Sequence, residues 1–317
     1  QVANLDVETS ENSIQESIAQ IYIQILYAAE SVKVNENTLQ VSIAQRDRGQ
    51  ELLNAGSIAK SDFAQLEAQV STDRYQLVTA QATLQDYKLQ LKQLLELDGE
   101  NEMNIYLPVL SDENVLLPLP AKKDVYMSAL TLRPEIEASK INVEASELGI
   151  DIAKAGYLPT ISLSAGIGTN HTSGSDFTFG EQVKNGWNNS IGVSVSVPIF
   201  NNRQTKSAVQ KAKLQRETSL LSLLDEQKTL YKTIEGLWLD ANSAQQRYAA
   251  ANEKLKSTQI SYDLISEQFD LGMKNTVELL TEKNNLLQAQ QEQLQAKYMA
   301  ILNTQLLKFY QGDKLAL

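Results

Sequence analysis

The chain has 317 residues, a formal net charge of −11, one histidine and no cysteine. The lack of cysteine excludes disulfide bonds, thiolate catalysis and cysteine-ligated metals, and the acidic balance argues against a nucleic-acid partner, which requires a basic face. Gly and Pro are sparse, and no run approaches the roughly 20 apolar residues of a membrane-spanning helix, so the composition favours long helices or coiled coil.

Residues 1–98 carry a helical pattern that stops once and restarts. Apolar residues recur every seven positions, which indicates packing against neighbouring helices. These residues are Ile18, Ile25, Val32 and Leu39. Gly56 suits the left-handed residue that ends a helix, and the pattern resumes directly after it. We therefore expect one long helical hairpin over 1–98, with its tip at 56–59.

The segment 99–133 has a different character and is expected to connect the long helices. Its prolines break helical structure. They are Pro108, Pro118 and Pro120. Residues 103–109 are compatible with a short strand. Pro134 then suits the first turn of a helix, which we expect over 134–156.

Residues 157–200 contain two segments in which apolar residues alternate with Ser and Gly. The apolar positions are Ile161, Leu163, Ala165, Ile167, Ile191, Val193, Val195, Val197 and Ile199. Each segment is about as long as the roughly 9–11 residues of a tilted membrane-spanning strand. Tyr157, Trp187 and Phe200 lie near the ends, where interfacial aromatics are expected. Two interpretations stay open: a hairpin of the transmembrane β-barrel type, or a hairpin that packs its apolar face on a soluble core.

Residues 201–317 repeat the long helical pattern. Two columns of residues recur every seven positions, which predicts supercoiled packing with neighbouring helices. They are Leu220, Gln227, Ile234, Ala241, Tyr248, Leu255, Tyr262 and Phe269, and Leu223, Leu230, Leu237, Ala244, Ala251, Thr258 and Ile265. A helix from Thr205 to Leu271 would be about 100 Å long at 1.5 Å per residue. It is expected to reverse at 272–275, which makes 201–317 a second hairpin with its tip near Gly272.

The two hairpins are related by a constant offset of 216 residues, the separation of Gly56 and Gly272. The offset holds without a gap from the first residue to about Asp98, so that Ile18 falls on Ile234. A constant offset over such a span indicates two structurally equivalent units. The predicted fold is mostly α: two very long coiled helical hairpins in pseudo-repeat, with an inserted β-hairpin of a transmembrane β-barrel type.

Three short motifs in this order carry a resemblance to a known family. They are Arg133-Pro134-Glu135-Ile136, Tyr157-Leu158-Pro159 and Val197-Pro198-Ile199-Phe200. With the two Gly-centred tips, they make the chain similar over essentially its whole length to the TolC-like outer-membrane efflux family. One departure is Asn201-Asn202-Arg203, where the family commonly has Asp-Gly-Gly. A second departure is that the counterparts of 134–200 and of an N-terminal helix are missing from the first half, so we expect the chain to be a fragment.

The resemblance implies a passive channel: the exit duct of a tripartite efflux or type I secretion system in the bacterial outer membrane, with a long periplasmic extension. Its implied partners are two more copies in a homotrimer, a periplasmic adaptor, an inner-membrane pump joined through that adaptor, and outer-membrane lipid. It implies no enzyme activity, no catalytic residue, no metal and no cofactor.

The resemblance also implies a gate at the periplasmic end. An acidic residue of the first hairpin pairs there with a basic and an aromatic residue of the second. Counted from each glycine, the matching positions are Asp62, Lys274 and Phe269, and Phe269 lacks the hydroxyl of the family's aromatic residue. Glu278 matches the first position of an acidic ring, and Thr281 replaces the second. The alternative is that Asp62 and Lys274 are exposed charges at unrelated helix starts.

The turns at both tips are the surface that the resemblance assigns to adaptor contact. They comprise Gly56, Ser57 and Ile58, and Gly272, Met273 and Lys274. Ile58 and Met273 are expected to be exposed apolar residues, which fits a partner site. The alternative is that both are ordinary turn residues that pack back onto the helices.

A non-channel periplasmic coiled-coil adaptor or scaffold protein is the alternative function, in which 157–200 would belong to a small soluble domain. An enzyme would require a concave cluster of polar groups, and the sequence offers none. The single histidine, His171, lies in the polar loop 169–189, where a solvated side chain is expected.

Overall fold

The computed structural model describes residues 1–97, 105–108 and 115–315. The chain forms two compact units. Apart from the first two residues, one unit comprises Ala3–Glu137 and Glu226–Leu317, and the other comprises Ala138–Asp225. Of the helices in the described residues, none is both long and apolar enough to cross a membrane.

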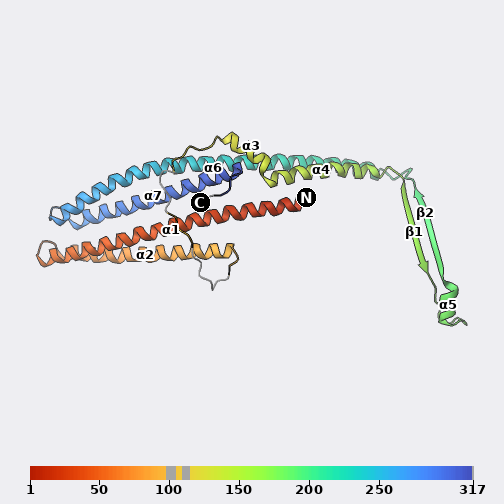
Figure 1. Ribbon diagram of the computed structural model, residues 1–317, viewed down its shortest axis with the longest axis horizontal. Coiled ribbons are helices and arrows are strands. Elements are labelled where there is room, and N and C mark those ends of the chain that lie inside the picture. The colour runs from red at the N-terminus through yellow and green to blue at the C-terminus, as the bar shows by residue number, and fades with distance from the viewer. Residues whose placement is uncertain (98–104, 109–114, 316–317) are drawn as a thin grey trace. The chain divides into compact units, whose positions relative to one another are not determined.

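The first hairpin of the larger unit consists of α1 (Val2–Asn54) and α2 (Lys60–Leu94) (Figure 1). α1 ends because Gly56 adopts a left-handed backbone with φ of +73°, which a residue without Cβ enters at no steric cost. The Gly56 amide then donates to Leu53 O (3.0 Å) and the Ser57 amide donates to Leu52 O (2.8 Å). This pair of hydrogen bonds is the Schellman motif, which satisfies carbonyls at the helix end.

The second hairpin repeats this geometry. It consists of α6 (Gln204–Asp270), whose first part belongs to the smaller unit, and α7 (Thr276–Gln311). Gly272 has the same φ of +73°, and the Met273 amide donates to Gln268 O at 2.8 Å. The ends of α1 and α6, and the starts of α2 and α7, are each 216 residues apart. The predicted pair of equivalent hairpins is confirmed, with α6 within one residue of its expected bounds.

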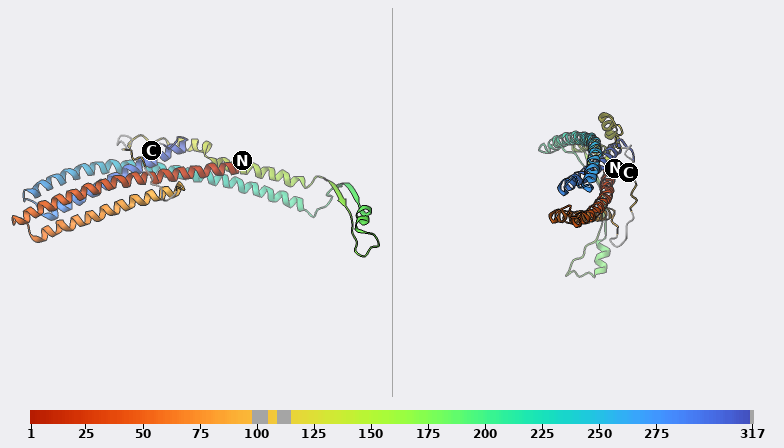
Figure 2. Two further views of the ribbon diagram at one scale, coloured as in Figure 1. Left: turned by 60° about the horizontal axis from the view of Figure 1, so that its bottom comes forward. Right: turned by 90° about the vertical axis from the view of Figure 1, so that its left-hand side faces the viewer.

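The two hairpins lie side by side within the larger unit (Figures 1 and 2). Their main core combines residues of α1, α6 and α7, such as Ile23, Tyr248 and Tyr298, each about 2% exposed. All fifteen heptad positions predicted in α6 are buried or half-buried. The 7-residue repeat therefore identifies the face by which this helix packs.

The connector contains one element that the sequence did not indicate, the helix α3 (Lys122–Leu132). α3 packs on α7, and Val125 and Ala129 are fully buried. Residues 105–108 have no regular structure, and the rest of the strand considered for 103–109 lies outside the described residues.

The smaller unit contains most of α4 (Pro134–Ala155), the start of α6, and a two-stranded antiparallel sheet of β1 (Thr160–Gly168) and β2 (Asn188–Ser196). α4 begins at Pro134 as predicted. The polar loop between the strands contains an unpredicted helix, α5 (Phe179–Gly186). Its start is capped by Glu181, whose carboxylate accepts from the Thr178 amide at 2.9 Å.

The turn from β2 into α6 uses an unusual backbone. Asn202 and Arg203 both have positive φ, +51° and +63°. These are the two positions at which the resembled family commonly has glycine, because glycine enters this region without strain. The departure noted in the sequence therefore changes the residues of the turn while the turn retains a left-handed conformation.

Candidate functional site

The tips of both hairpins contain equivalent carboxylates that cap the second helix. Asp62 Oδ2 accepts from the Ala59 amide at 3.3 Å, and Glu278 Oε2 accepts from the Asn275 amide at 3.2 Å. Both residues occupy the third position of their helix, so each negative charge also faces the positive end of the helix dipole. This local role accounts for an acidic residue after each glycine.

Lys274 pairs within its own tip. Its Nζ lies 2.5 Å from Glu278 Oε1, one helical turn away, and both side chains are partly exposed. The hydrogen bond from Lys274, followed by that from the Asn275 amide, holds the pKa of Glu278 below its usual range. Among the described residues, no hydrogen bond or ion pair joins Asp62 to Lys274. The structure therefore places the predicted acidic and basic gate residues at the same end of the two hairpins without joining them within one chain.

Phe269, the third predicted gate residue, is buried. It is 3% exposed and packs with Leu66 of α2 and Leu279 of α7. Nearby, Gln45 donates to Tyr262 Oη at 2.8 Å, which links α1 to α6. The aromatic side chain therefore belongs to the apolar cluster that holds the two hairpin tips together.

The two tips differ in how much apolar surface they expose. Leu271, Met273 and Val277 of the second tip are 68%, 70% and 58% exposed. The equivalent residues of the first tip are Ala55, Ser57 and Ser61. Met273 is exposed as expected. Ile58 is half-buried rather than fully exposed.

A buried ion pair joins the two hairpins farther from the tips. Asp73 of α2 pairs with Lys283 of α7, and the Ser42 hydroxyl of α1 bonds to both. All three residues are no more than 3% exposed. Burial lowers the pKa of Lys283, and the contact with Asp73 opposes that shift by favouring the charged form. The sequence patterns did not predict this pair. A signal that could have indicated it was that Asp73 lies on the same helical face as the apolar residues Leu66 and Val70.

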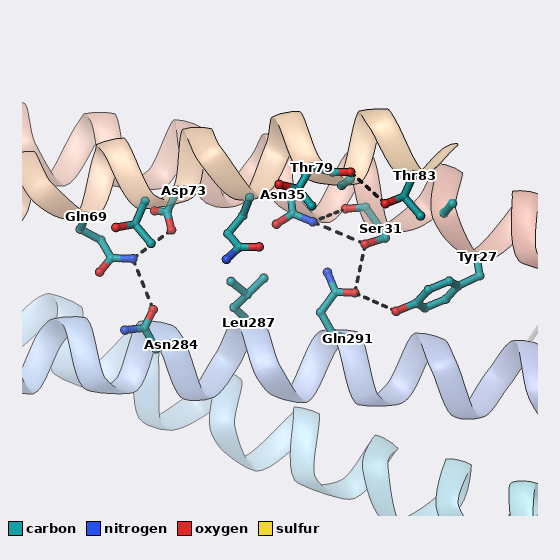
Figure 3. A pocket seen from close by; sticks show the side chains of 14 residues that line it. Tyr27, Ser31, Asn35, Gln69, Asp73, Thr79, Thr83, Asn284, Leu287 and Gln291 are labelled. Carbon is teal, nitrogen blue, oxygen red and sulfur yellow. Dashed lines mark hydrogen bonds between the residues drawn. The ribbon is translucent and has the colours of Figure 1, made fainter. Parts of the chain in front are cut away.

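A polar groove of about 360 Å³ adjoins the buried pair (Figure 3). α1, α2 and α7 supply its lining, which consists mainly of amides and hydroxyls. Gln69 donates to Asp73 at 2.9 Å and to Asn284 at 3.4 Å. Gln291 Oε1 accepts from the Ser31 hydroxyl at 3.1 Å and from the Tyr27 hydroxyl at 3.4 Å. Hydrogen bonds therefore connect the two hairpins along this seam.

The Arg133-Pro134-Glu135 motif fixes the start of α4. The Arg133 guanidinium lies 2.7 Å from Glu135, 3.5 Å from Glu16 of α1, and 4.4 Å from the ring centroid of Tyr310 in α7. The side chain of Arg133 is 10% exposed. Burial of the phenol and the nearby Glu16 carboxylate raise the pKa of Tyr310 to about 12.

The β-hairpin exposes one purely aliphatic face. Its register pairs Ile161 with Val195 and Leu163 with Val193, and the opposite face pairs Ser162 with Ser194. The large aliphatic residues of this face are 62–83% exposed. These are Ile161, Leu163, Ile167, Ile191, Val193 and Val195. Alternation therefore predicts the two faces correctly, and the apolar one packs on no core among the described residues.

His171 lies in the loop between the strands. Its Nδ1 is 3.1 Å from Gln182 Oε1, and its ring contacts Phe179 at 5.2 Å between centroids. In the part of the chain that the structure describes, no group of three or more His, Cys, Asp or Glu side chains is placed to hold a metal ion.

A family model described as outer membrane efflux protein matches residues 125–312, more than half of the chain. The chain belongs to the outer membrane efflux protein family. Among curated members, it is 25% identical over 294 residues to the outer membrane efflux protein BepC of Brucella suis. It is 23% identical over 313 residues to the outer membrane protein TolC of Escherichia coli. These alignments cover 92% and 95% of the chain but only 61% and 62% of the relatives, so the chain spans less than two thirds of their length.

Solved structures of this family have the same fold. The channel CusC superposes with a TM-score of 0.83 at 19% identity, covering 99% of this chain and 71% of CusC. VceC of Vibrio cholerae superposes with a TM-score of 0.79 at 17% identity, covering 99% and 73%. The predicted fold class and the resemblance to TolC-like proteins are both confirmed.

Proposed function

We propose that this chain forms part of a passive exit duct that crosses the bacterial outer membrane and extends into the periplasm. One observation carries the proposal: the β-hairpin has an exposed aliphatic face backed by a face of Ser and Gly. Lipid solvates the first kind of face, and a water-filled lumen solvates the second. A soluble scaffold would gain nothing from so much exposed aliphatic surface.

A homotrimer is proposed because the two strands of one chain cannot close a sheet into a barrel. Two strands leave backbone groups unpaired at both edges, and unpaired groups cost several kcal/mol each in lipid. Strands from further copies would satisfy them. The names of two relatives, a protease secretion protein and a toxin and drug export protein, support a role in export.

The hairpin tips are proposed as the periplasmic gate and the adaptor contact. Asp62 and Lys274 lie at the same end of the two hairpins. Lys274 of one copy could therefore leave its ion pair with Glu278 and form one with Asp62 of another copy. Glu278 from three copies would form an acidic ring that favours cations. The exposed Leu271, Met273 and Val277 of the second tip suit an apolar patch on a periplasmic adaptor, which would connect an inner-membrane pump.

Membrane insertion and conductance test the channel. In the intact protein, Val193→Asp places a charge on the aliphatic face of β2, whereas Ser194→Asp places the same charge on the opposite face. A lipid-facing carboxylate is costly, so Val193→Asp should abolish outer-membrane insertion while Ser194→Asp inserts and conducts in planar bilayers. Equal behaviour of the two variants, or a wild-type protein that purifies without detergent and never conducts, would contradict the proposal and favour the scaffold alternative.

A further inference from the structure

The loop between β1 and β2 contains an ordered helix, α5, for which the proposed channel gives no role. α5 lies at the end of the two strands that is farther from α4 and α6 (Figure 1). Phe177 and Phe179 of this otherwise polar loop are 62% and 65% exposed, and Trp187, which directly follows α5, is 58% exposed. Large aromatic side chains gathered at one exposed place indicate contact with a partner.

Hydrogen bonds within the loop hold α5 in a defined conformation. Gln182 Oε1 accepts from the Thr172 amide at 2.7 Å, and Gln182 Nε2 donates to the Phe177 carbonyl at 2.8 Å. At the start of the helix, the Glu181 carboxylate accepts from both the amide and the hydroxyl of Thr178. The exposed aromatic side chains are therefore presented by an ordered segment.

α5 has one apolar face and one polar face. Phe179 and Val183 are four residues apart, so they lie on one side of the helix. Glu181, Lys184 and Asn185 lie on the opposite side, and all three are exposed. A helix with an aromatic apolar face and a charged polar face is suited to lie in the plane of a membrane interface.

α5 is attached to the aliphatic side of the β-hairpin. Thr169 directly follows β1, and because side chains alternate along a strand, it lies on the same side as Ile167. The Thr169 hydroxyl donates to the Val183 carbonyl of α5 at 3.1 Å. A Cβ at Gly186 would lie 3.1 Å from Thr169 Oγ1, so the end of α5 also approaches this side chain closely.

Trp187 continues the aliphatic face on β2. It directly precedes Asn188 and has an extended backbone, with φ of −63° and ψ of 119°, so alternation places it on the side of Ile191. Ser190 and the other Ser and Gly residues of the strands lie on the opposite side. A helix that covered the mouth of a lumen would be attached from that opposite side. α5 therefore belongs to the side that the proposed function assigns to lipid.

We propose that α5 lies in the interfacial layer of the outer leaflet of the outer membrane, with Phe179 and Val183 toward the acyl chains and Lys184 and Asn185 toward the headgroups. The proposal rests on the proposed function and extends its lipid contact beyond the strands. In the proposed duct the long helices extend into the periplasm, so the loop between the strands reaches the outer surface. Aromatic side chains favour the interfacial layer, and α5 would thereby fix the depth of the β-hairpin in the membrane.

Burial of apolar surface, rather than attraction between charges, accounts for this contact. Residues 169–187 contain one basic side chain, Lys184, and two acidic side chains, Asp176 and Glu181. With His171 neutral, one positive and two negative charges leave a net charge of −1, which gives no attraction to anionic headgroups. We therefore expect the contact to depend little on salt concentration.

Fluorescence quenching by brominated lipids tests this placement. Intact protein in which every tryptophan is replaced by phenylalanine, Trp187→Phe and Trp238→Phe among them, is reconstituted in bilayers. Phe179→Trp in this background reports on the apolar face of α5. Asn185→Trp is the matched control on the opposite face of the same helix, and Val193→Trp reports on lipid contact of the strands.

Bromine near the headgroups should quench Phe179→Trp about twofold more strongly than Asn185→Trp, because the apolar face of an interfacial helix lies about 5–10 Å deep. Asn185→Trp should instead be quenched by iodide in the aqueous phase. Bromine near the ends of the acyl chains should quench Val193→Trp most strongly. If Phe179→Trp does not fold, Phe177→Trp is a second conservative probe in the same loop, and the same quenching by shallow bromine is expected.

The outcomes separate the placement of α5 from the channel itself. Quenching of Val193→Trp without quenching of Phe179→Trp overturns the placement alone, and would mean that water, the mouth of the duct or a loop of another copy surrounds the helix. Equal quenching of Phe179→Trp and Asn185→Trp also overturns it, because an interfacial helix immerses one face. Quenching of Phe179→Trp without quenching of Val193→Trp overturns the channel and leaves the contact of α5 with lipid in place.

Discussion

Asp73 of α2 and Lys283 of α7 form an ion pair that is almost completely excluded from solvent and joins the two hairpins. The Ser42 hydroxyl completes the group from α1. Removing two charges from water costs free energy that their attraction only partly offsets. The pair is therefore better explained as a means of fixing which helices meet, and in which register, than as a source of net stability.

Breaking this pair should be strongly destabilising. Lys283→Met leaves a buried Asp73 carboxylate without its cation and is expected to cost about 3–5 kcal/mol of unfolding free energy, measured by urea denaturation. The double variant Asp73→Leu/Lys283→Met should recover most of that loss. Lys254→Met is the matched control, because Lys254 is 44% exposed and its pair with Glu292 should contribute less than about 1 kcal/mol. Equal losses for Lys283→Met and Lys254→Met would contradict the role assigned to burial.

The turn before α6 should accept glycine. Arg203 has φ of +63°, so Arg203→Gly should relieve backbone strain and stabilise the turn by about 0.5–1 kcal/mol. Asn201→Gly provides the contrast, because Asn201 lacks a positive φ and its side chain bonds to Thr205. Hydrogen exchange at residues 200–206 should therefore slow in Arg203→Gly and accelerate in Asn201→Gly. Faster exchange in Arg203→Gly would refute this explanation.

Stability should fall at high pH through Tyr310. Its folded pKa of about 12 lies above the value of about 10 expected in the unfolded chain. A raised folded pKa gives stability that is complete below pH 10 and is lost as pH rises toward 12, by up to about 2–3 kcal/mol. Glu16, Glu135 and Arg133 face the phenol, and the raised pKa of Arg133 keeps its guanidinium charged over this interval.

Tyr310→Phe should remove this part of the alkaline transition. Melting temperatures at pH 9 and pH 11.5 are then expected to differ less in Tyr310→Phe than in the parent protein. Tyr75→Phe, at a 69% exposed position, should change nothing. A Tyr310→Phe variant that retains the full loss between the two pH values would show that another group titrates.

The proposed gate can be tested through its charges. Three Asp62–Lys274 links of about 0.5 kcal/mol each would shift a closed–open equilibrium about tenfold. Asp62→Ala with Lys274→Ala in the intact protein should therefore raise conductance and antibiotic leakage several-fold. Lys274→Arg keeps the charge and should remain closed, and Lys60→Ala controls for the loss of a basic residue elsewhere at the tip. Unchanged leakage in the double variant would remove the gate from the proposed function.

Much of the fold was predictable because its signals are local or periodic. The glycine of each tip marks a left-handed residue, the heptads mark the packed face of α6, and the alternation around Leu163 marks two faces of a hairpin. α3 and α5 were not predicted from the sequence because each is short. A short helix is stabilised by packing or capping more than by a periodic apolar face.

The contacts at the candidate site were less predictable. Counting from the glycines places Asp62 and Lys274 at the tips, but it does not predict their partners. In the structure each contacts a residue of its own hairpin: Asp62 accepts from the Ala59 amide, and Lys274 pairs with Glu278. Phe269 packs in an apolar cluster with Leu66 and Leu279, which are distant from it or from each other in the sequence. Spacing along the chain could not predict this contact.

The sequence by itself determined that two equivalent helical hairpins flank a hairpin of strands, because the constant offset and the regular periods can be read from the order of the residues alone. Only the tertiary structure decided that Asp73 meets Lys283 and that Arg133 lies against Tyr310. These relations join residues far apart in the chain, and they depend on how helices pack, which no local pattern specifies.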